Sequence, residues 1–302
     1  MNNTLKVESV RQLNALFGKP ETEHPLITII DFSAIKDYQT FVGAKIYSEL
    51  YSIMLKQQCD TTFRYGREKY DFQEGTLVFV APGQVVEIED EIESPKTKDW
   101  GIFFHPDLLF GTNLNNTIKD YSFFNYTTNE ALQVSLKEKD TLNDIVVKLE
   151  EEISMNIDKH SQRLIVSNIE LLLNYCTRYF DRQFITRAKK NYGTLTKFEA
   201  LLNKYFDSEL VLTNGTPTVK HLATELNMSS NYMSDLLKKE TGLSALEHIH
   251  KAIAKEAKRK LLLPDNSISS VAYELGFEYP QYFTRLFKKE TGMTPKEFRN
   301  LN

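Results

Sequence analysis

The sequence predicts an α+β fold in two parts: an amino-terminal antiparallel β barrel or sandwich with following helices, and an all-α carboxy-terminal domain. Three observations lead to this prediction. Short runs rich in Val, Ile, Phe and Tyr occur between residues 26 and 105, separated by Gly, Pro, Asp and charged clusters. Apolar residues recur at helical intervals between residues 129 and 184. The last part of the chain, 218–299, contains an internal repeat.

The strand-like runs are interrupted by turn residues, as is typical of an antiparallel sheet. They are LITIIDF, AKIYSELYSIML, TTFRYG, GTLVFVAPG and WGIFFHP. Apolar stripes over 142–153 and 165–173 predict two amphipathic helices, which either pair two subunits or pack on their own barrel. The basic, weakly patterned segment 182–196 is predicted to be a linker, and 198–206 one more helix.

The composition is that of a globular protein with two ordinary domains: 302 residues, of which 41% are hydrophobic and 26% charged. No apolar run is long enough to span a bilayer, and the first residues do not resemble a signal peptide, so a cytoplasmic location is expected. The net charge is −4, but residues 215–302 hold 13 Lys and Arg against 10 Asp and Glu. The tail therefore carries +3 and the remainder −7, which is modest support for nucleic-acid binding by the tail.

No cofactor and no metal are predicted. Cys59 and Cys176 are too few and too far apart for a disulfide framework or a cysteine-rich metal site. Before residue 130 the chain has only His24 and His105, with no H-x-H pair, so a catalytic metal site is not expected. Candidate pocket-lining residues are Tyr47, Arg64, Tyr65, Trp100 and His105. Aromatic residues on strands more often belong to the core, so these five are not predicted as a site.

The repeat is the most informative feature of the chain. TVKHLATELNMSSNYMSDLLKKETGLSALEHI (218–249) aligns with SISSVAYELGFEYPQYFTRLFKKETGMTPKEFR (267–299), with one added residue, Glu278. The pentad KKETG is identical in the two copies. Each copy predicts a helix, a tight turn and a second helix, with motifs at 218–242 and 267–292.

Matched start and stop residues support these two motifs. Thr218 and Ser267 can cap a first helix, and Asn227 and Gly276 favour the left-handed backbone at which such a helix ends. Pro280 suits the first position of a helix. Gly242 and Gly292 end the second helix, and Ser244 with Glu247 and Thr294 with Glu297 predict capping boxes for a third. The predicted buried faces are Met233, Leu236 and Leu237 in one copy and Phe283, Leu286 and Phe287 in the other.

A helix-turn-helix places its second helix in the major groove of DNA, so double-stranded DNA is the predicted partner. Side chains of Asn and Gln can pair with adenine and Arg with guanine, at roughly 1 to 3 kcal/mol of discrimination each, while Lys suits phosphates. The predicted DNA-binding residues are Ser229, Ser230, Asn231, Ser234 and Lys238 in the first copy and Gln281, Thr284, Arg285 and Lys288 in the second.

A predicted helix of about 17 residues, HIHKAIAKEAKRKLLL, joins the copies and would span roughly 25 Å. Successive major-groove faces lie about 34 Å apart, so this connector can place both second helices on one side of a duplex. Its Lys255, Lys258, Arg259 and Lys260 are expected to supply salt-sensitive attraction to phosphates. No catalytic residues are predicted.

The tail resembles the AraC/XylS family of bacterial transcription regulators over residues 216–299, and AYELGFEYPQYFTRLFKKETGMTPKEFR is similar to that family's signature. The resemblance implies a cupin-like, ligand-sensing β barrel followed by dimerising helices, hence a homodimer and a small-molecule effector as further partners. YDFQEGTLVFVAPGQ (70–84) is similar to part of such a barrel. The implied domains are a sensor at 1–128, dimerisation helices and linker at 129–190, and a DNA-binding domain at 191–302.

Many family members carry a basic residue where this chain has Asp235, and a carboxylate there repels phosphate, although it can accept a hydrogen bond from cytosine. The second copy, with Gln281 and Arg285, is therefore expected to discriminate between sequences. Two other hypotheses are a cupin-like enzyme with a helical targeting tail and a tail that binds partner proteins. A plain helical bundle with a solvated basic face is the structural alternative, which the matched stops and caps disfavour.

Overall fold

The structure is a computed structural model and describes residues 4–19, 23–35, 44–56, 75–87, 99–127, 130–190, 193–263 and 265–301. The chain forms two compact units, Met1–Gln183 and Phe184–Asn302. Among the helices of the described residues, none combines the length and the apolar character needed to cross a membrane.

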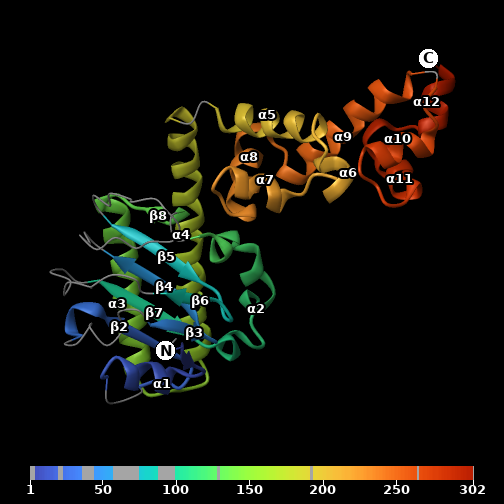
Figure 1. Cartoon of the computed structure of the whole chain (residues 1–302). Helices are drawn as coiled ribbons and strands as arrows, with labels where there is room; N and C mark the ends of the chain where they lie inside the picture. The colour runs from blue at the N-terminus through green and yellow to red at the C-terminus, as the bar shows by residue number, and fades with distance from the viewer. Residues whose placement is uncertain are drawn as a thin grey trace. The chain divides into compact units, whose positions relative to one another are not determined.

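The amino-terminal unit contains two β-sheets (Figure 1). The larger sheet is antiparallel with the strand order β2-β7-β4-β5-β8, and the smaller has the order β1-β3-β6. The strands are β1 (Thr4–Val7), β2 (Ile27–Asp31), β3 (Lys45–Ser48), β4 (Tyr51–Lys56), β5 (Thr76–Val80), β6 (Val85–Glu87), β7 (Trp100–Phe104) and β8 (Leu132–Gln133).

The core of this unit centres on β7, which lies between β2 and β4 and is buried along its whole length. A strand that is covered on both faces is expected to be a continuous apolar run, and WGIFF is one. Ile102 lies opposite both Ile29 and Ile53 in the two ladders. The ring of Phe104 stacks on Tyr51, with 5.1 Å between the ring centroids. These pairs hold the five-stranded sheet together on either side of β7.

The predicted antiparallel barrel needs correction. Within the described residues the strands form two separate sheets, and β1 pairs with β3 in parallel. Strands β1, β6 and β8 were not predicted, because segments of two to four residues are too short to show an alternating pattern. Of the predicted runs, TTFRYG (61–66) lies outside the described residues.

Short helical segments connect the strands of this unit. They are α1 (Val10–Leu16), α2 (Leu114–Thr117) and the 3₁₀ turns at Phe32–Ala34, Pro106–Leu109, Ile118–Asp120 and Ser122–Asn125. Helix α1 was not predicted from the sequence. Its first turn is capped by Ser9, whose side chain accepts a hydrogen bond from the backbone N–H of Gln12.

Two long helices, α3 (Leu136–Ser154) and α4 (Ser161–Lys190), run beside the five-stranded sheet (Figure 1). Helix α3 begins with a capping box formed by Ser135 and Glu138. The predicted apolar stripes are confirmed as buried faces. They comprise Leu142, Ile145, Val146, Leu149 and Ile153 on α3 and Ile165, Ile169, Leu172 and Leu173 on α4.

Helix α4 continues to Lys190, so the first half of the predicted linker 182–196 is helical. Long-range contacts explain this difference. The guanidinium of Arg182 donates to both carboxylate oxygens of Glu138, at 3.1 and 2.7 Å, and to the backbone oxygen of Gln133. The amide of the buried Gln183 bonds to the backbone of Gln133 and Ala131. These bonds hold the helix where its apolar pattern is weak.

The carboxy-terminal unit is all-α, as predicted, and its helices share one hydrophobic core. Helix α9 is central, because Ile249, Ile253, Ala257 and Leu261 recur every four residues and are all buried. The helices after α4 are α5 (Thr194–Phe206), α6 (Leu210–Asn214), α7 (Val219–Glu225), α8 (Ser230–Thr241), α9 (Ala245–Leu261), α10 (Ile268–Glu274), α11 (Pro280–Thr291) and α12 (Pro295–Leu301).

Candidate nucleic-acid interface

The two predicted helix-turn-helix motifs are present as α7–α8 and α10–α11. The Thr218 hydroxyl accepts from the backbone N–H of His221 at 3.2 Å, and Ser267 accepts from Ser270 at 2.9 Å, which caps the first helix of each motif. Each first helix then stops at a residue with a left-handed backbone. Those residues are Asn227, with φ 55°, and Gly276, with φ 84°.

The second helices begin and end as the sequence predicted. Ser229 caps α8 by accepting from the backbone N–H of Tyr232 at 3.1 Å, and Pro280 occupies the first position of α11. Gly242 and Gly292 end them with φ values of 79° and 82°.

The identical pentad KKETG has a structural role at these ends. The Thr241 hydroxyl donates to the Leu237 carbonyl at 2.8 Å and accepts from the backbone N–H of Leu243 at 3.2 Å. Thr291 makes the matching bonds, to Phe287 at 2.7 Å and from Met293 at 3.4 Å. The threonine and the glycine of each pentad therefore end the helix. The two lysines of each pentad are exposed on the surface.

A glutamate carboxylate caps the start of the following helix in each copy. Glu247 accepts from the backbone N–H of Ser244 at 2.7 Å, and Glu297 accepts from that of Thr294 at the same distance. These backbone hydrogen bonds hold the pKa of both carboxylates below its ordinary value. The predicted capping pairs are thus confirmed.

The buried and outward faces of α8 and α11 also follow the prediction. Met233, Leu236 and Leu237 are buried, as are Phe283 and Phe287, and Leu286 is half-buried. Five of the predicted DNA-binding residues are exposed: Asn231, Lys238, Gln281, Arg285 and Lys288. The other four are half-buried: Ser229, Ser230, Ser234 and Thr284.

Three of the half-buried hydroxyls bond within the domain. Ser229 is the α8 cap, Ser234 accepts from the backbone N–H of Ala245 at 3.3 Å, and Thr284 donates to the Pro280 carbonyl at 3.0 Å. The Ser234 bond ties the second helix of the first motif to the start of α9. Hydroxyls that are engaged in this way are less suited to base contacts than the exposed side chains of Gln281 and Arg285.

A contact that the sequence did not predict ties the two motifs together. A Cβ on Gly276 would lie 2.4 Å from the carbonyl carbon of Gly215 and 2.7 Å from the backbone nitrogen of Thr216. The Tyr205 hydroxyl donates to the carbonyl of Gly215 at 3.1 Å and helps to hold this segment. The turn of the second motif therefore packs against the backbone that leads into the first, so the two copies share a fixed geometry.

The carboxy-terminal segment is similar to known regulators. Residues 222–301 match the helix-turn-helix domain family. The uncharacterised HTH-type transcriptional regulator YobQ of Bacillus subtilis is 39% identical over 83 residues, which are 28% of this chain and 34% of that protein. The uncharacterised transcriptional regulatory protein YesN of the same organism is 38% identical over 76 residues, or 24% of this chain and 21% of that protein.

The carboxy-terminal domain is an AraC-type helix-turn-helix domain. The chain spans between 12% and 34% of the length of the first three curated relatives that it matches. Among solved structures, the carboxy-terminal domain of AraT, a response regulator from Geobacillus stearothermophilus, is 26% identical and aligns with a TM-score of 0.32. That alignment covers 36% of this chain and 85% of the other.

Several basic side chains of the connector helix α9 contact other residues of the AraC-type domain. Lys260 forms an ion pair of 2.7 Å with Glu274, and Arg259 one of 2.6 Å with Glu256. The ammonium of Lys258 lies 5.8 Å from the ring centroid of Phe298. Three of the four predicted phosphate-attracting side chains therefore have partners inside the domain, which leaves Lys255 as the exposed cation best placed for that role.

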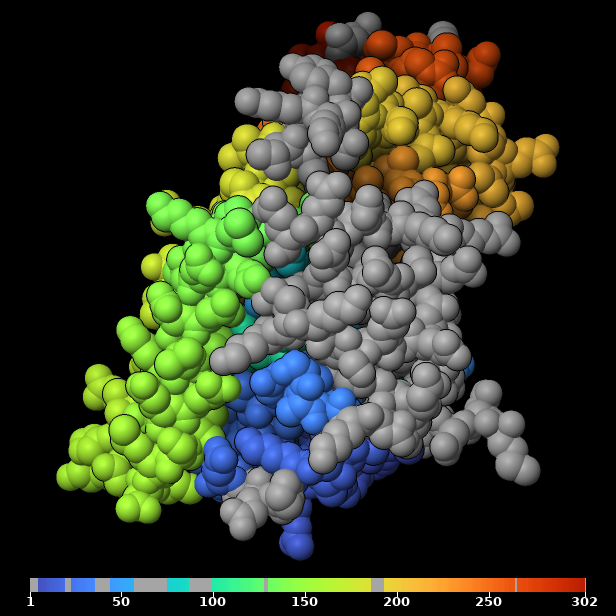
Figure 2. Space-filling model, turned by 90° about the vertical axis from the view of Figure 1, so that its left-hand side faces the viewer, coloured from blue at the N-terminus to red at the C-terminus, as the bar shows by residue number. Residues whose placement is uncertain are grey.

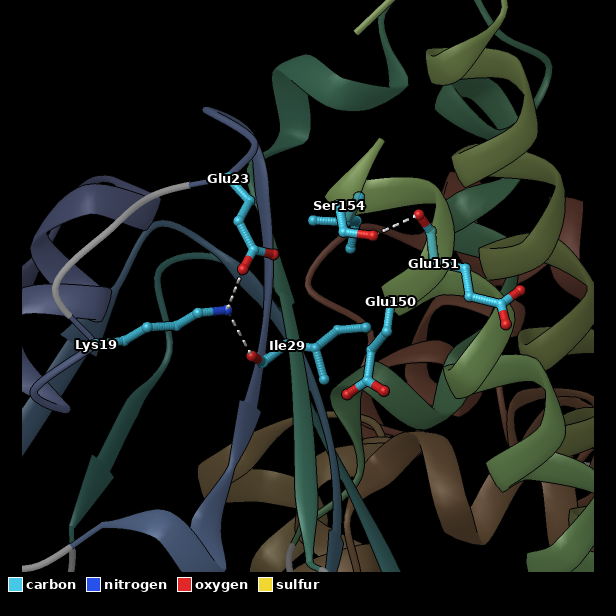
Figure 3. Close-up of a pocket in the computed structure, with 7 residues that line it drawn as sticks. Lys19, Glu23, Ile29, Glu150, Glu151 and Ser154 are labelled. Atoms are coloured by element: carbon cyan, nitrogen blue, oxygen red, sulfur yellow. Dashed lines mark hydrogen bonds and ion pairs between the residues drawn. The ribbon is translucent and has the colours of Figure 1, made fainter. Parts of the chain in front are cut away.

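The amino-terminal unit has a shallow pocket of about 360 Å³ between the segment after α1 and the end of α3 (Figure 3). The Lys19 ammonium points toward the carboxylate of Glu23, at 3.8 Å, and the Ile29 carbonyl, at 3.4 Å. The lining residues are Lys19, Glu23, Ile29, Glu150, Glu151, Ile153 and Ser154. Among the described residues, no three His, Cys, Asp or Glu side chains lie close enough together to hold a metal ion.

Of the five candidate pocket-lining residues from the sequence, the structure describes Tyr47, Trp100 and His105, and none of these three lines this pocket. Trp100 is buried and donates to the Asn143 side chain at 2.8 Å. His105 caps the turn after β7 by accepting from the backbone N–H of Asp107. Tyr47 lies on β3, and Arg64 and Tyr65 lie outside the described residues.

Proposed function

We propose that this chain is a sequence-specific DNA-binding transcription regulator that reads a duplex with α8 and α11. One observation carries the proposal: two matched helix-turn-helix motifs share a single core and expose polar faces on their second helices. The proposed DNA-binding residues are Ser229, Ser230, Asn231, Ser234, Lys238, Gln281, Thr284, Arg285 and Lys288. Action on chromosomal DNA places the protein in the cytoplasm of a bacterium.

The two motifs are proposed to contribute unequally. Gln281 and Arg285 are exposed on α11 and have the side chains that pair with adenine and guanine. In the first motif Asn231 and Lys238 are exposed. The half-buried Asp235 carries a carboxylate, which has the same negative charge as phosphate and repels it. The second motif therefore discriminates between sequences, and the first mainly positions the protein on the duplex.

Selection of bound duplexes from a random pool by the full-length protein tests the proposed function. The affinity for the selected duplex and for a shuffled duplex of equal composition is then measured at several salt concentrations. We expect the selected duplex to bind tighter by a factor on the order of 10³ or more. Equal affinity for both duplexes at every salt concentration would refute the proposed function.

The amino-terminal part is proposed to control DNA binding through dimerisation or a small-molecule effector, with a cupin-like sensor at 1–128, dimerisation helices and linker at 129–190, and the DNA-binding domain at 191–302. Exposed apolar side chains on α3 and on the start of α4, whose surface is seen in Figure 2, support a homodimer. On α3 Val147 is 51% exposed, and on α4 Leu164 and Leu171 are 48% and 43% exposed. Leu164 and Leu171 are two helical turns apart, on one side of α4.

Introducing charge at this face should weaken the dimer. We expect Leu164→Glu combined with Leu171→Glu to shift the full-length protein from dimer toward monomer in analytical ultracentrifugation, because both carboxylates would have to be buried at the interface. Arg163→Glu is the matched control, since Arg163 is exposed on α4 and outside the Leu164–Leu171 line. If the double variant and the wild type have the same association constant, these leucines are not at a dimer interface.

A further inference from the structure

A pair of matched tyrosines has opposite surroundings in the two motifs. Tyr232 on α8 and Tyr282 on α11 occupy equivalent positions of the repeat, yet Tyr232 is 4% exposed and Tyr282 is 54% exposed. Tyr232 packs against Phe184, with 5.2 Å between the ring centroids. The Tyr282 ring instead meets the ring of Tyr279 edge-on at 5.9 Å, and Tyr279 is itself 48% exposed.

Tyr279 and Tyr282 begin a strip along one side of α11. Tyr279, Tyr282, Arg285 and Lys289 are spaced by three, three and four residues, which places them on neighbouring turns, and all four are exposed. We call these four residues the tyrosine–cation strip. The equivalent side chains of the first motif are those of Ser229, Tyr232, Asp235 and Lys239. That motif thus has a buried ring and a carboxylate where the second has an exposed ring and a guanidinium.

The position of the strip relative to the outward face indicates what it can contact. Successive residues of an α-helix are about 100° apart, so Tyr282 lies roughly a quarter-turn from Gln281. When Gln281 and Arg285 face the floor of the major groove, a side chain a quarter-turn away faces the groove wall, where the phosphates lie. Two cations beside the rings favour a polyanion over an apolar protein surface.

The Tyr282 hydroxyl is available for such a contact. Among the described residues it has no hydrogen-bond partner, and a phenol O–H can donate to a phosphate oxygen. We propose that Tyr282 donates a hydrogen bond to a backbone phosphate at the edge of the groove read by Arg285. Tyr279 acts as a positioning residue that holds the Tyr282 ring. This inference rests on the proposed function and adds a DNA contact specific to the second motif.

The test compares Tyr282→Phe, which removes only the hydroxyl, with the wild-type full-length protein on the selected and the shuffled duplex. We expect Tyr282→Phe to weaken binding to both duplexes by a similar factor, roughly threefold to tenfold. The dependence on salt should keep its slope, because a neutral donor displaces no counterion. Tyr273→Phe is the matched control, since Tyr273 is 55% exposed on α10 and outside the strip, and it should bind as the wild type does.

The outcomes separate the inference from the proposed function. If the wild-type protein does not distinguish the two duplexes, the proposed function fails and the inference falls with it. If the wild type discriminates and Tyr282→Phe binds each duplex as tightly as the wild type does, the inference alone is overturned. The strip is then left as a protein-docking surface. A loss confined to the selected duplex also overturns the phosphate contact, because it assigns Tyr282 to a base.

Discussion

Replacing Gly276 with Asn is expected to lower the free energy of unfolding of the AraC-type domain by roughly 2 to 4 kcal/mol. Asn tolerates a left-handed backbone, so the φ of 84° is not the main cost. The cost arises because the new Cβ would lie 2.4 Å from the Gly215 carbonyl carbon and 2.7 Å from the backbone nitrogen of Thr216. These are backbone atoms, and they cannot move aside as the end of a flexible side chain can.

The chain supplies a matched control and a convenient readout. Asn227 has φ 55° at the equivalent turn of the first motif, so Asn227→Gly should change stability by less than about 1 kcal/mol. Denaturant unfolding followed by far-ultraviolet circular dichroism reports the helices of both units, while the fluorescence of Trp100, the one tryptophan of the chain, reports the amino-terminal unit. A transition that appears in circular dichroism but not in fluorescence therefore belongs to the all-α unit. An unchanged helical transition in Gly276→Asn would show that the Gly215 contact does not hold the motifs together.

Replacing Arg285 with Gln is expected to remove most of the discrimination contributed by the second motif. A bidentate contact between Arg and guanine is worth roughly 1 to 3 kcal/mol, which is about fivefold to 150-fold in affinity. Arg285 is exposed and lies away from the buried Phe283 and Phe287, so the variant should fold as the wild type does. Binding to the selected duplex should fall by this factor, while binding to a shuffled duplex should change far less.

Lys238→Gln on the first motif is the comparison for Arg285→Gln. Lys238 is exposed at the far end of α8, where a cation is suited to phosphate rather than to a base. Its loss should weaken binding to selected and shuffled duplexes alike and reduce the salt slope by about one. If Lys238→Gln abolishes discrimination and Arg285→Gln does not, the roles assigned to the two motifs are reversed.

The sequence predicted the parts of the AraC-type domain that depend on neighbouring residues. Hydroxyl caps at Thr218 and Ser267 and left-handed stops at Asn227 and Gly276 follow from the chemistry of one helical turn. The apolar period likewise identified the buried faces of α3, α8 and α11. In the amino-terminal half, the longer apolar runs were predicted as strands because their pattern also depends on neighbouring residues.

Features that depend on contacts between distant residues could not be predicted in this way. The Gly276–Gly215 approach joins residues that no periodic pattern relates, and the parallel pairing of β1 with β3 depends on a crossover. Tyr232 and Tyr282 show the limit most clearly, because the same residue type at matched positions is buried in one copy and exposed in the other. Phe184 packs on Tyr232, and no periodic pattern in the sequence relates these two residues.

The central claim is that α8 and α11, held in one core, read two adjacent segments on one side of a duplex. Hydroxyl-radical footprinting of the full-length protein on its selected duplex should show two protected segments about one helical turn apart, assigned by the loss of one of them in Arg285→Gln. Inserting five base pairs between them turns one segment by about half a turn and should cost most of the sequence-specific affinity. Unchanged affinity after this insertion would contradict the claim.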